Sequence, residues 1–310
     1  MLKRWRKSKK LMEGMNYTEV LTTRPTEAIE IAKNEMPNYD GIIAVGGDGT
    51  VNEVVNGLLA TPENQKRHLL GMVPIGTGND LANTMQIHLS VERAIETLKD
   101  GIPTKVDVGV VEGSDFHGNT VRRYFLGVAS FGFDAEVAND TAHGRKWLPG
   151  TWNYFSSTIK NLIWIKKRAF EIEVDGGSET IREEAFFLAI GNGKFYGAGM
   201  MICPDADVYD GIFNCTFVRP VSRFKFLRVF PKVYTGEHRH HPAVRMFSGR
   251  SFAIKTDKKT LYQVDGEVLG NLPATVKGLN LGINIMLPRD KPDFFLKRKP
   301  KMVKGDPIAP

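Results

Sequence analysis

The sequence predicts an α/β domain with a mostly parallel sheet, followed by a second domain built as a β-rich antiparallel sandwich. Residues 18–99 alternate short apolar runs with helical patterns, which is typical of a sheet flanked by helices. Two of these apolar runs end in glycine-rich turns, at residues 46–50 and 74–80. After residue 108, runs rich in Val, Phe, Tyr and Ile are separated by Gly, Asp and Asn, a pattern that indicates antiparallel strands.

Length and composition agree with two globular domains. The chain has 310 residues, of which 42% are hydrophobic and 25% charged. No apolar run approaches the roughly 18–20 residues that span a bilayer, and no hydrophobic signal core follows the basic N-terminus. We therefore expect a cytoplasmic protein in which Cys203 and Cys215 are reduced thiols.

The net charge of +7 is moderate, but the basic residues are clustered. Clusters occur at residues 3–10, 219–232 and 297–301. Such clusters suit nucleic acid or an anionic membrane surface, and they equally suit solvated faces and tails. Because no nucleic-acid-binding motif accompanies them, we expect no nucleic-acid partner.

The first domain, residues 1–108, is predicted from the following elements in order. They are a basic helix (1–15), a strand (18–22), a helix (25–36), a strand (42–45), a glycine turn and helix (46–59), a strand (69–73), a second glycine turn and helix (74–87), and an amphipathic helix (91–99).

The second domain, residues 109–290, is predicted from seven strands and two helices. The strands are 122–128, 170–174, 185–190, 212–218, 251–255, 261–264 and 279–287, and the helices are 155–167 and 223–234. Residues 291–310 form a C-terminal segment that ends in a loose tail. A cleft between the two domains is expected.

The turn Gly46-Gly47-Asp48-Gly49-Thr50 has the features of a phosphate site. Glycines permit a close backbone approach, and the helix that follows offers free N–H groups and a positive dipole end. Asp48 could hold the accompanying metal. A plain tight turn is the alternative, and the following Asn52-Glu53 makes it the weaker interpretation.

Four acidic residues lie beside glycine or at predicted strand ends: Asp48, Asp80, Asp107 and Asp265. Singly, each is more often a turn former. Together they offer oxygen ligands for Mg²⁺ and a carboxylate to orient an attacking hydroxyl, as phosphoryl transfer requires. The acidic loop 204–211 is compatible with a further metal site or with a surface turn, and spacing alone favours the turn.

These residues resemble the soluble bacterial lipid kinases of the diacylglycerol kinase catalytic-domain type, which are related to sphingosine kinases. The segments that carry the resemblance span most of the chain in the family's order. They are GGDGTVNEVVNGL (46–58), PIGTGNDLA (74–82), TKVDVG (104–109), GNGKFYGAGM (191–200), PDADVYDGIF (204–213) and VDGE (264–267).

The resemblance implies an ATP- and Mg²⁺-dependent kinase that phosphorylates the hydroxyl of diacylglycerol or a related membrane lipid. Asp265, or Glu267 beside it, would be the general base. The catalytic Mg²⁺ would be organised by Asp48, Asp80 and Asp107, and a second, structural Mg²⁺ would be held by Asp207, Asp210 and Ile212. ATP would be bound by Thr22, Gly46, Gly47, Asp48, Gly49, Thr50, Val51, Asn52, Glu53, Gly76 and Thr77.

One feature departs from the family pattern. Family members open with a strand that ends in an Asn-Pro-x-Ser/Ala-Gly turn, whereas residues 1–21 match the helix and strand that follow it. Either the sequence begins downstream of the protein's true start, or the protein has lost a strand of its nucleotide sheet. For the chain as given we expect reduced nucleotide affinity or stability.

Two other functions stay open at this stage: an NAD kinase-like enzyme with a soluble substrate, and a nucleotide-binding regulatory protein without turnover. A lipid kinase would take its substrate from the bilayer surface and act peripherally at the inner membrane. The helix at 223–234, which is apolar on one side and basic around it, is either an interfacial helix or a core helix with a solvated face. Whether the chain forms a homodimer stays open.

Overall fold

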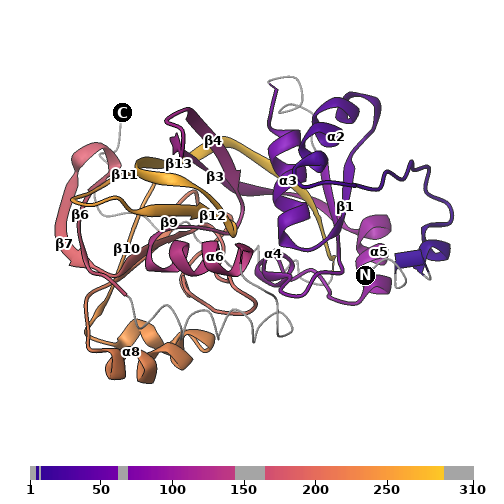
Figure 1. The fold of residues 1–310 in the computed structure, drawn as a ribbon. Coiled ribbons are helices and arrows are strands. Elements are labelled where there is room, and N and C mark those ends of the chain that lie inside the picture. The colour runs from indigo at the N-terminus through magenta and orange to yellow at the C-terminus, as the bar shows by residue number, and fades with distance from the viewer. Residues whose placement is uncertain (1–4, 7, 62–68, 144–164, 290–310) are drawn as a thin grey trace, which may run out of the picture.

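The computed structural model describes residues 5–6, 8–61, 69–143 and 165–289. Its elements form two parts that lie side by side, a helix-covered sheet and a larger antiparallel β structure (Figure 1). The predicted helix at 155–167 lies almost entirely outside the described residues, and the predicted tail lies wholly outside them.

The first part is built on two parallel strands, β1 (Ile42–Gly46) and β2 (Leu69–Pro74). Successive side chains of a strand point to opposite faces, so both faces of this apolar pair need cover. One face packs against α2 (Glu27–Glu35) and α3 (Asp48–Leu58), and the other packs against α5 (Val91–Asp100).

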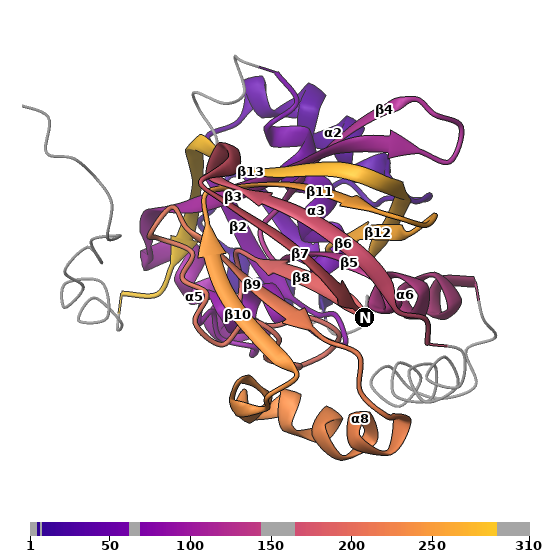
Figure 2. The same cartoon turned by 90° about the vertical axis from the view of Figure 1, so that its left-hand side faces the viewer.

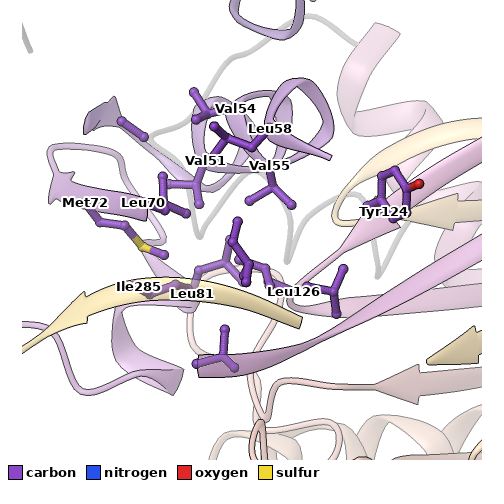
Figure 3. Packing of buried hydrophobic residues seen from close by; sticks show 14 of the residues in the cluster. Val51, Val54, Val55, Leu58, Leu70, Met72, Leu81, Tyr124, Leu126 and Ile285 are labelled. Atoms are coloured by element: carbon purple, nitrogen blue, oxygen red, sulfur yellow. The ribbon is translucent and has the colours of Figure 1, made fainter. Parts of the chain in front are cut away.

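Helix α3 follows the glycine turn and fills the core over the sheet. Its apolar residues recur at helical spacing and contact Leu70 and Met72 of β2 (Figure 3). The short helix α4 (Asp80–Thr84), which follows the second glycine turn, adds Leu81 to the same core. The strand–turn–helix units predicted at both glycine turns are thereby confirmed.

The predicted strand at 18–22 is wrong. This segment is extended but lies in no strand, and Val20 and Leu21 are each 54% exposed. Its residue pattern suits a strand, but it pairs with none of the described strands, although β1, which pairs with β2 alone among them, has an open edge. Upstream, Trp5 and Met12 of the N-terminal helical segment, which includes a 3-10 turn (Lys9–Met12), are buried against α5.

The second part confirms the predicted antiparallel, β-rich architecture. Its strands run in the order β10-β9-β8-β5-β12-β13-β11-β6-β7 around a core rich in buried aromatic residues. Their bounds are β5 Val128–Gly132, β6 Arg168–Val174, β7 Glu179–Ala185, β8 Phe187–Gly191, β9 Phe213–Val218, β10 Val244–Gly249, β11 Ser251–Thr256, β12 Leu261–Val264 and β13 Glu267–Leu287.

Two long strands, β3 (Ile102–Asp115) and β13, run through both parts and join them (Figure 1). The predicted boundary at residue 108 therefore lies inside β3. Near its end β13 turns from the sandwich to the first sheet, where Asn284 and Ile285 pair in parallel with β2. β4 (Thr120–Phe125) pairs with β3 as an antiparallel hairpin.

Helices cover one end of the sandwich. α6 (Phe133–His143) follows β5, and the predicted helix at 223–234 is confirmed as α8 (Arg223–Val229) with a 3-10 turn (Phe230–Tyr234). Both views place α8 at the bottom of the sandwich, away from α2 and α3 (Figures 1 and 2). Among the described residues, none of the helices is both long and apolar enough to cross a bilayer.

Candidate active site

The two glycine turns pack against each other, backbone to backbone. Ile75 N donates to Gly46 O at 2.9 Å, which ties the end of β2 to the end of β1. A Cβ added to Gly76 would lie 2.5 Å from the Cα of Gly47, so this approach requires glycine. A Cβ on Gly49, by contrast, would meet no protein atom within 4 Å. The open space at the start of α3 fits a phosphate group, which the N–H groups there would bind.

Asp48 and Asp80 converge on Gly78 from the two turns. A Cβ on Gly78 would lie 3.2 Å from Oδ2 of Asp48 and 3.5 Å from Oδ2 of Asp80. Asp48 accepts a hydrogen bond from Leu81 N at 2.9 Å. Burial, and next the negative charge of Asp48, raise the pKa of Asp80 to about 6.

This pair of like charges fits a divalent cation. The negative charge of Asp48 contributes to the raised pKa of Asp80, so the two carboxylates repel each other, and a bound cation would remove that repulsion. The described residues hold no cluster of three or more His, Cys, Asp or Glu side chains that could bind a metal by themselves. Mg²⁺ is commonly bound by one or two carboxylates together with substrate phosphates, and the donors present match that pattern.

Asp80 is held by a hairpin of the second part of the molecule. The N–H groups of Ala198 and Gly199 donate to its two oxygens at 2.7 and 2.8 Å. The hairpin is closed by a bridge between Tyr196 and Met200. The sequence segment 191–200 belonged to the family resemblance, but sequence reasoning assigned its residues no role.

Asp265 follows β12 in a left-handed conformation, with φ of 47°. Its carboxylate turns inward and accepts hydrogen bonds from the N–H groups of Leu126, Gly127 and Val128 at 2.9 to 3.2 Å. Burial of the carboxylate raises its pKa to about 6, although these hydrogen bonds act in the opposite direction.

Asn52 joins Asp265 to the glycine turn. Its Nδ2 donates to Asp265 Oδ2 at 2.9 Å and to Tyr124 O at 3.0 Å. Since Asn52 lies one turn into α3, the carboxylate of the second part rests on the helix that begins the phosphate site. The charge of Asp48 is also close enough to raise the pKa of Asp265. The structure thus brings Asp48, Asp80 and Asp265 to one region between the two parts.

Glu267, the other candidate base, lies on the outer side of the same turn. It is exposed and forms an ion pair with Arg123. Of the two carboxylates, the geometry favours Asp265 as the group that faces a substrate.

The remaining predicted nucleotide residues have different surroundings. Glu53 accepts from Thr26 N and Ala28 N at 3.1 and 3.2 Å and so caps α2. Val51 is buried in the core, as is the side chain of Asn52. Thr50 packs over Gly46, while Thr77 is exposed at the second glycine turn and Thr22 is exposed in the extended segment. Their contacts with a nucleotide stay predictions.

Asp107 contacts the acidic loop and not the other two acids of the predicted catalytic set. Its Oδ2 accepts from Gly211 N at 2.7 Å, and its N–H donates to Val208 O at 2.7 Å. Burial raises its pKa. Within the loop, Asp207 accepts from Tyr209 N and Asp210 accepts from Ile212 N, at 3.3 and 3.0 Å. The second metal site at Asp207, Asp210 and Ile212 stays a prediction.

An apolar pocket of about 60 Å³ lies beside the hairpin that binds Asp80. Its walls come from α6, α8, the 3-10 turn after α8, and strands β8 and β9. Tyr196 and Met200 line it on one side, and the residues between them bind Asp80. The hairpin therefore touches the pocket and the acidic site at once.

Comparisons with known proteins agree with this architecture. Residues 1–111 match the family described as the diacylglycerol kinase catalytic domain, and residues 127–287 match the YegS C-terminal NAD kinase beta sandwich-like domain.

Curated relatives cover most of the chain. A diacylglycerol kinase of Staphylococcus saprophyticus is 29% identical over 273 residues, which are 88% of this chain and 84% of the relative. A diacylglycerol kinase of Staphylococcus aureus is 32% identical over 254 residues, which are 82% of this chain and 76% of the relative. A crystal structure of a diacylglycerol kinase from Bacillus anthracis shares the fold, with a TM-score of 0.65 at 20% identity over 87% of this chain and 85% of that one.

Proposed function

The chain belongs to the diacylglycerol kinase family, and from that premise we propose that it transfers the γ-phosphoryl group of ATP, with Mg²⁺, to the hydroxyl of diacylglycerol or a related lipid. One observation carries the proposal. The buried carboxylate of Asp265 rests on the helix that begins at the glycine turn, beside Asp48 and Asp80. A phosphoryl donor and an acceptor hydroxyl could meet at that point.

The residues of the chain divide the chemistry between them. N–H groups at the two glycine turns bind the phosphates, and the carboxylates of Asp48 and Asp80 would hold Mg²⁺. When bound, Mg²⁺ supplies charge neutralisation on the triphosphate. Asp265 accepts the proton of the acceptor hydroxyl, and a pKa of about 6 leaves it ionised, yet basic enough, at neutral pH.

The apolar pocket supports a lipid acceptor. It is lined mainly by apolar side chains and lies beside the hairpin that binds Asp80. An aliphatic chain in this pocket would leave the polar end of the lipid near the acidic residues. The riboses and phosphates of a soluble substrate such as NAD would find few polar partners in this lining.

The outer surface of α8 supports approach to a membrane. Phe224 is 86% exposed, and Leu227 is 38% exposed. The basic residues Arg223, Lys225 and Arg228 lie around them. An apolar side chain ringed by cations suits the interface of an anionic bilayer. Sedimentation with anionic and neutral vesicles at two salt concentrations tests this, with Phe224→Ala as the variant. Vesicle binding that depends neither on the charge of the lipid nor on the salt concentration would argue against this approach to the membrane.

The enzymatic proposal is tested by transfer of labelled phosphate from ATP to diacylglycerol in mixed micelles, with NAD as a parallel acceptor. We expect Asp265→Asn to abolish lipid phosphorylation and Glu267→Gln to leave most of it. Full activity of Asp265→Asn would refute the assignment of the base. Phosphorylation of NAD in place of the lipid would refute the acceptor class.

A further inference from the structure

Asp134 is a buried acid in the wall of the apolar pocket. It lies in the first turn of α6 and is 4% exposed. The neighbouring lining residues Phe133, Val137 and Phe187 are apolar, and Asp134 is the one carboxylate among the described residues that line the pocket. Tyr196, His238 and His241 are the other titratable groups of the lining.

Neither carboxylate oxygen of Asp134 has a hydrogen-bond partner among the described residues. The hydroxyls of Ser130 and Tyr196 are near enough to lower its pKa, but they do not reach hydrogen-bond geometry. The Ser130 hydroxyl oxygen accepts a hydrogen bond from Nε2 of Gln263 at 2.5 Å.

An acid in this position needs an explanation. Buried polar groups are nearly always hydrogen-bonded, because an unpaired one is costly to remove from water. Asp134 supports no ion pair and, among the described residues, its side chain accepts no hydrogen bond that would fix the fold. Burial raises its pKa to about 7, so the neutral acid, which is an O–H donor, is well populated at neutral pH.

We propose that Asp134 is a specificity-determining residue that donates a hydrogen bond to an ester carbonyl oxygen of the acceptor lipid, whose acyl chain fills the pocket. This inference rests on the proposed function, and it narrows the acceptor to an acylated lipid. The ester carbonyl supplies an acceptor atom at the head of an apolar chain, and Asp134, the one carboxyl group among the described lining residues, can donate to it. A lipid that brings no acceptor leaves this donor buried and unpaired, and is rejected for that reason.

A protonated long-chain amine does not fit the pocket as well. It would need the carboxylate in its ionised form, which the apolar lining disfavours. His238, which lies in the same lining, is also held neutral, because burial lowers its pKa. The lining therefore favours the neutral form of Asp134, which is a hydrogen-bond donor.

Three variants separate the polar contact from the shape of the pocket. Asp134→Asn keeps the shape and a donor, and Asp134→Leu keeps the approximate shape without a donor. Val137→Ala, one turn along α6 in the same lining, enlarges the pocket and leaves the acid in place. The two Asp134 variants should fold, since each removes an uncompensated buried acid, and thermal melting checks this.

The probes are 1,2-dioctanoylglycerol and its dioctyl ether analogue, which lacks the ester carbonyls and keeps the same hydroxyl. Binding is measured by calorimetry in micelles without nucleotide, and phosphorylation is measured in parallel. We expect the wild-type protein and Asp134→Asn to prefer the ester on the order of tenfold, the value of one buried hydrogen bond. Asp134→Leu should lose the preference, and Val137→Ala should weaken both lipids equally.

Three results would overturn the inference: no ester preference in the wild-type protein, an unchanged preference in Asp134→Leu, or tighter binding of sphinganine than of the ester with loss of that binding in Asp134→Asn. The expected pattern of binding without any phosphorylation would support the role of Asp134 and refute the kinase proposal. Phosphorylation with no effect of Asp134→Leu would do the reverse.

Discussion

Asn52 should set the proton affinity of Asp265, and its removal should move the acidic limb of the pH–rate profile. Its Nδ2 hydrogen bond to Asp265 stabilises the ionised carboxylate. A hydrogen bond to a charged group contributes about 1.5–3 kcal/mol, and 1.36 kcal/mol corresponds to one pKa unit. In Asn52→Ala we therefore expect the pKa of Asp265 to rise from about 6 by roughly one to two units.

The assay is kcat/KM for lipid phosphorylation between pH 5 and pH 9. A base must be ionised to act, so the rate of the wild-type protein should climb to a plateau above its pKa of about 6. The Asn52→Ala protein should be several-fold slower at pH 7 and should recover most of its activity near pH 9. Recovery at high pH distinguishes a shifted base from a damaged site.

Asn56 provides the matched control for this experiment. It donates to Tyr124 O at 3.0 Å, as Asn52 does, and accepts from Tyr124 N at 2.9 Å. It also donates to Oδ1 of Asn52 at 3.1 Å, but it makes no hydrogen bond to Asp265 itself. Asn56→Ala should lower the melting temperature and leave the acidic limb near pH 6. If Asn52→Ala loses activity equally at every pH, or if its limb does not move, the reasoning is refuted.

Three further outcomes are expected. Burial raises the pKa of Asp265 from 3.8 to about 6, so the folded protein binds this proton more tightly than the unfolded chain does, and the free energy of unfolding falls as the pH rises from about 4 to about 6. Asp265→Asn should therefore flatten the dependence of the melting temperature on pH in this range. An unchanged dependence would contradict this. Gly49→Ala should keep the melting temperature of the wild-type protein but weaken ATP binding. Gly57→Ala should lower the melting temperature, because its Cβ would lie 2.4 Å from Ile29 O. Equal melting temperatures of the two variants would contradict this prediction. Finally, Cys203 and Cys215 are buried, and burial raises the pKa of Cys203 to about 12, so neither thiol should react with a disulfide reagent until the protein unfolds.

Local patterns in the sequence were sufficient for the elements that carry the phosphate site. The glycines at 46–50 and 76–78 specify backbone turns through their own conformational freedom. The apolar spacing after Thr50 specifies a helix, because it places one face of α3 on the core. These features depend on residues a few positions apart, so they can be read before the fold is known. The family resemblance named Asp265 without indicating what holds it.

The tertiary structure decided which of these groups meet. Asn52 and Asp265 are 213 residues apart, and no local pattern pairs them. The same holds for Asp107, which bonds to the acidic loop, and for the N–H groups of Ala198 and Gly199 at Asp80.

The wrong strand prediction at residues 18–22 has the same origin. Residues 18–22 have a strand-like pattern but lie in no strand, and the end of β13 completes a sheet that begins more than two hundred residues earlier. A sequence determines local backbone preference, whereas pairing in a sheet and the partner of a buried acid depend on what packing brings alongside. The glycine turns of this chain could therefore be predicted from the sequence. The meeting of the acidic residues and the apolar pocket beside them became known only from the tertiary structure.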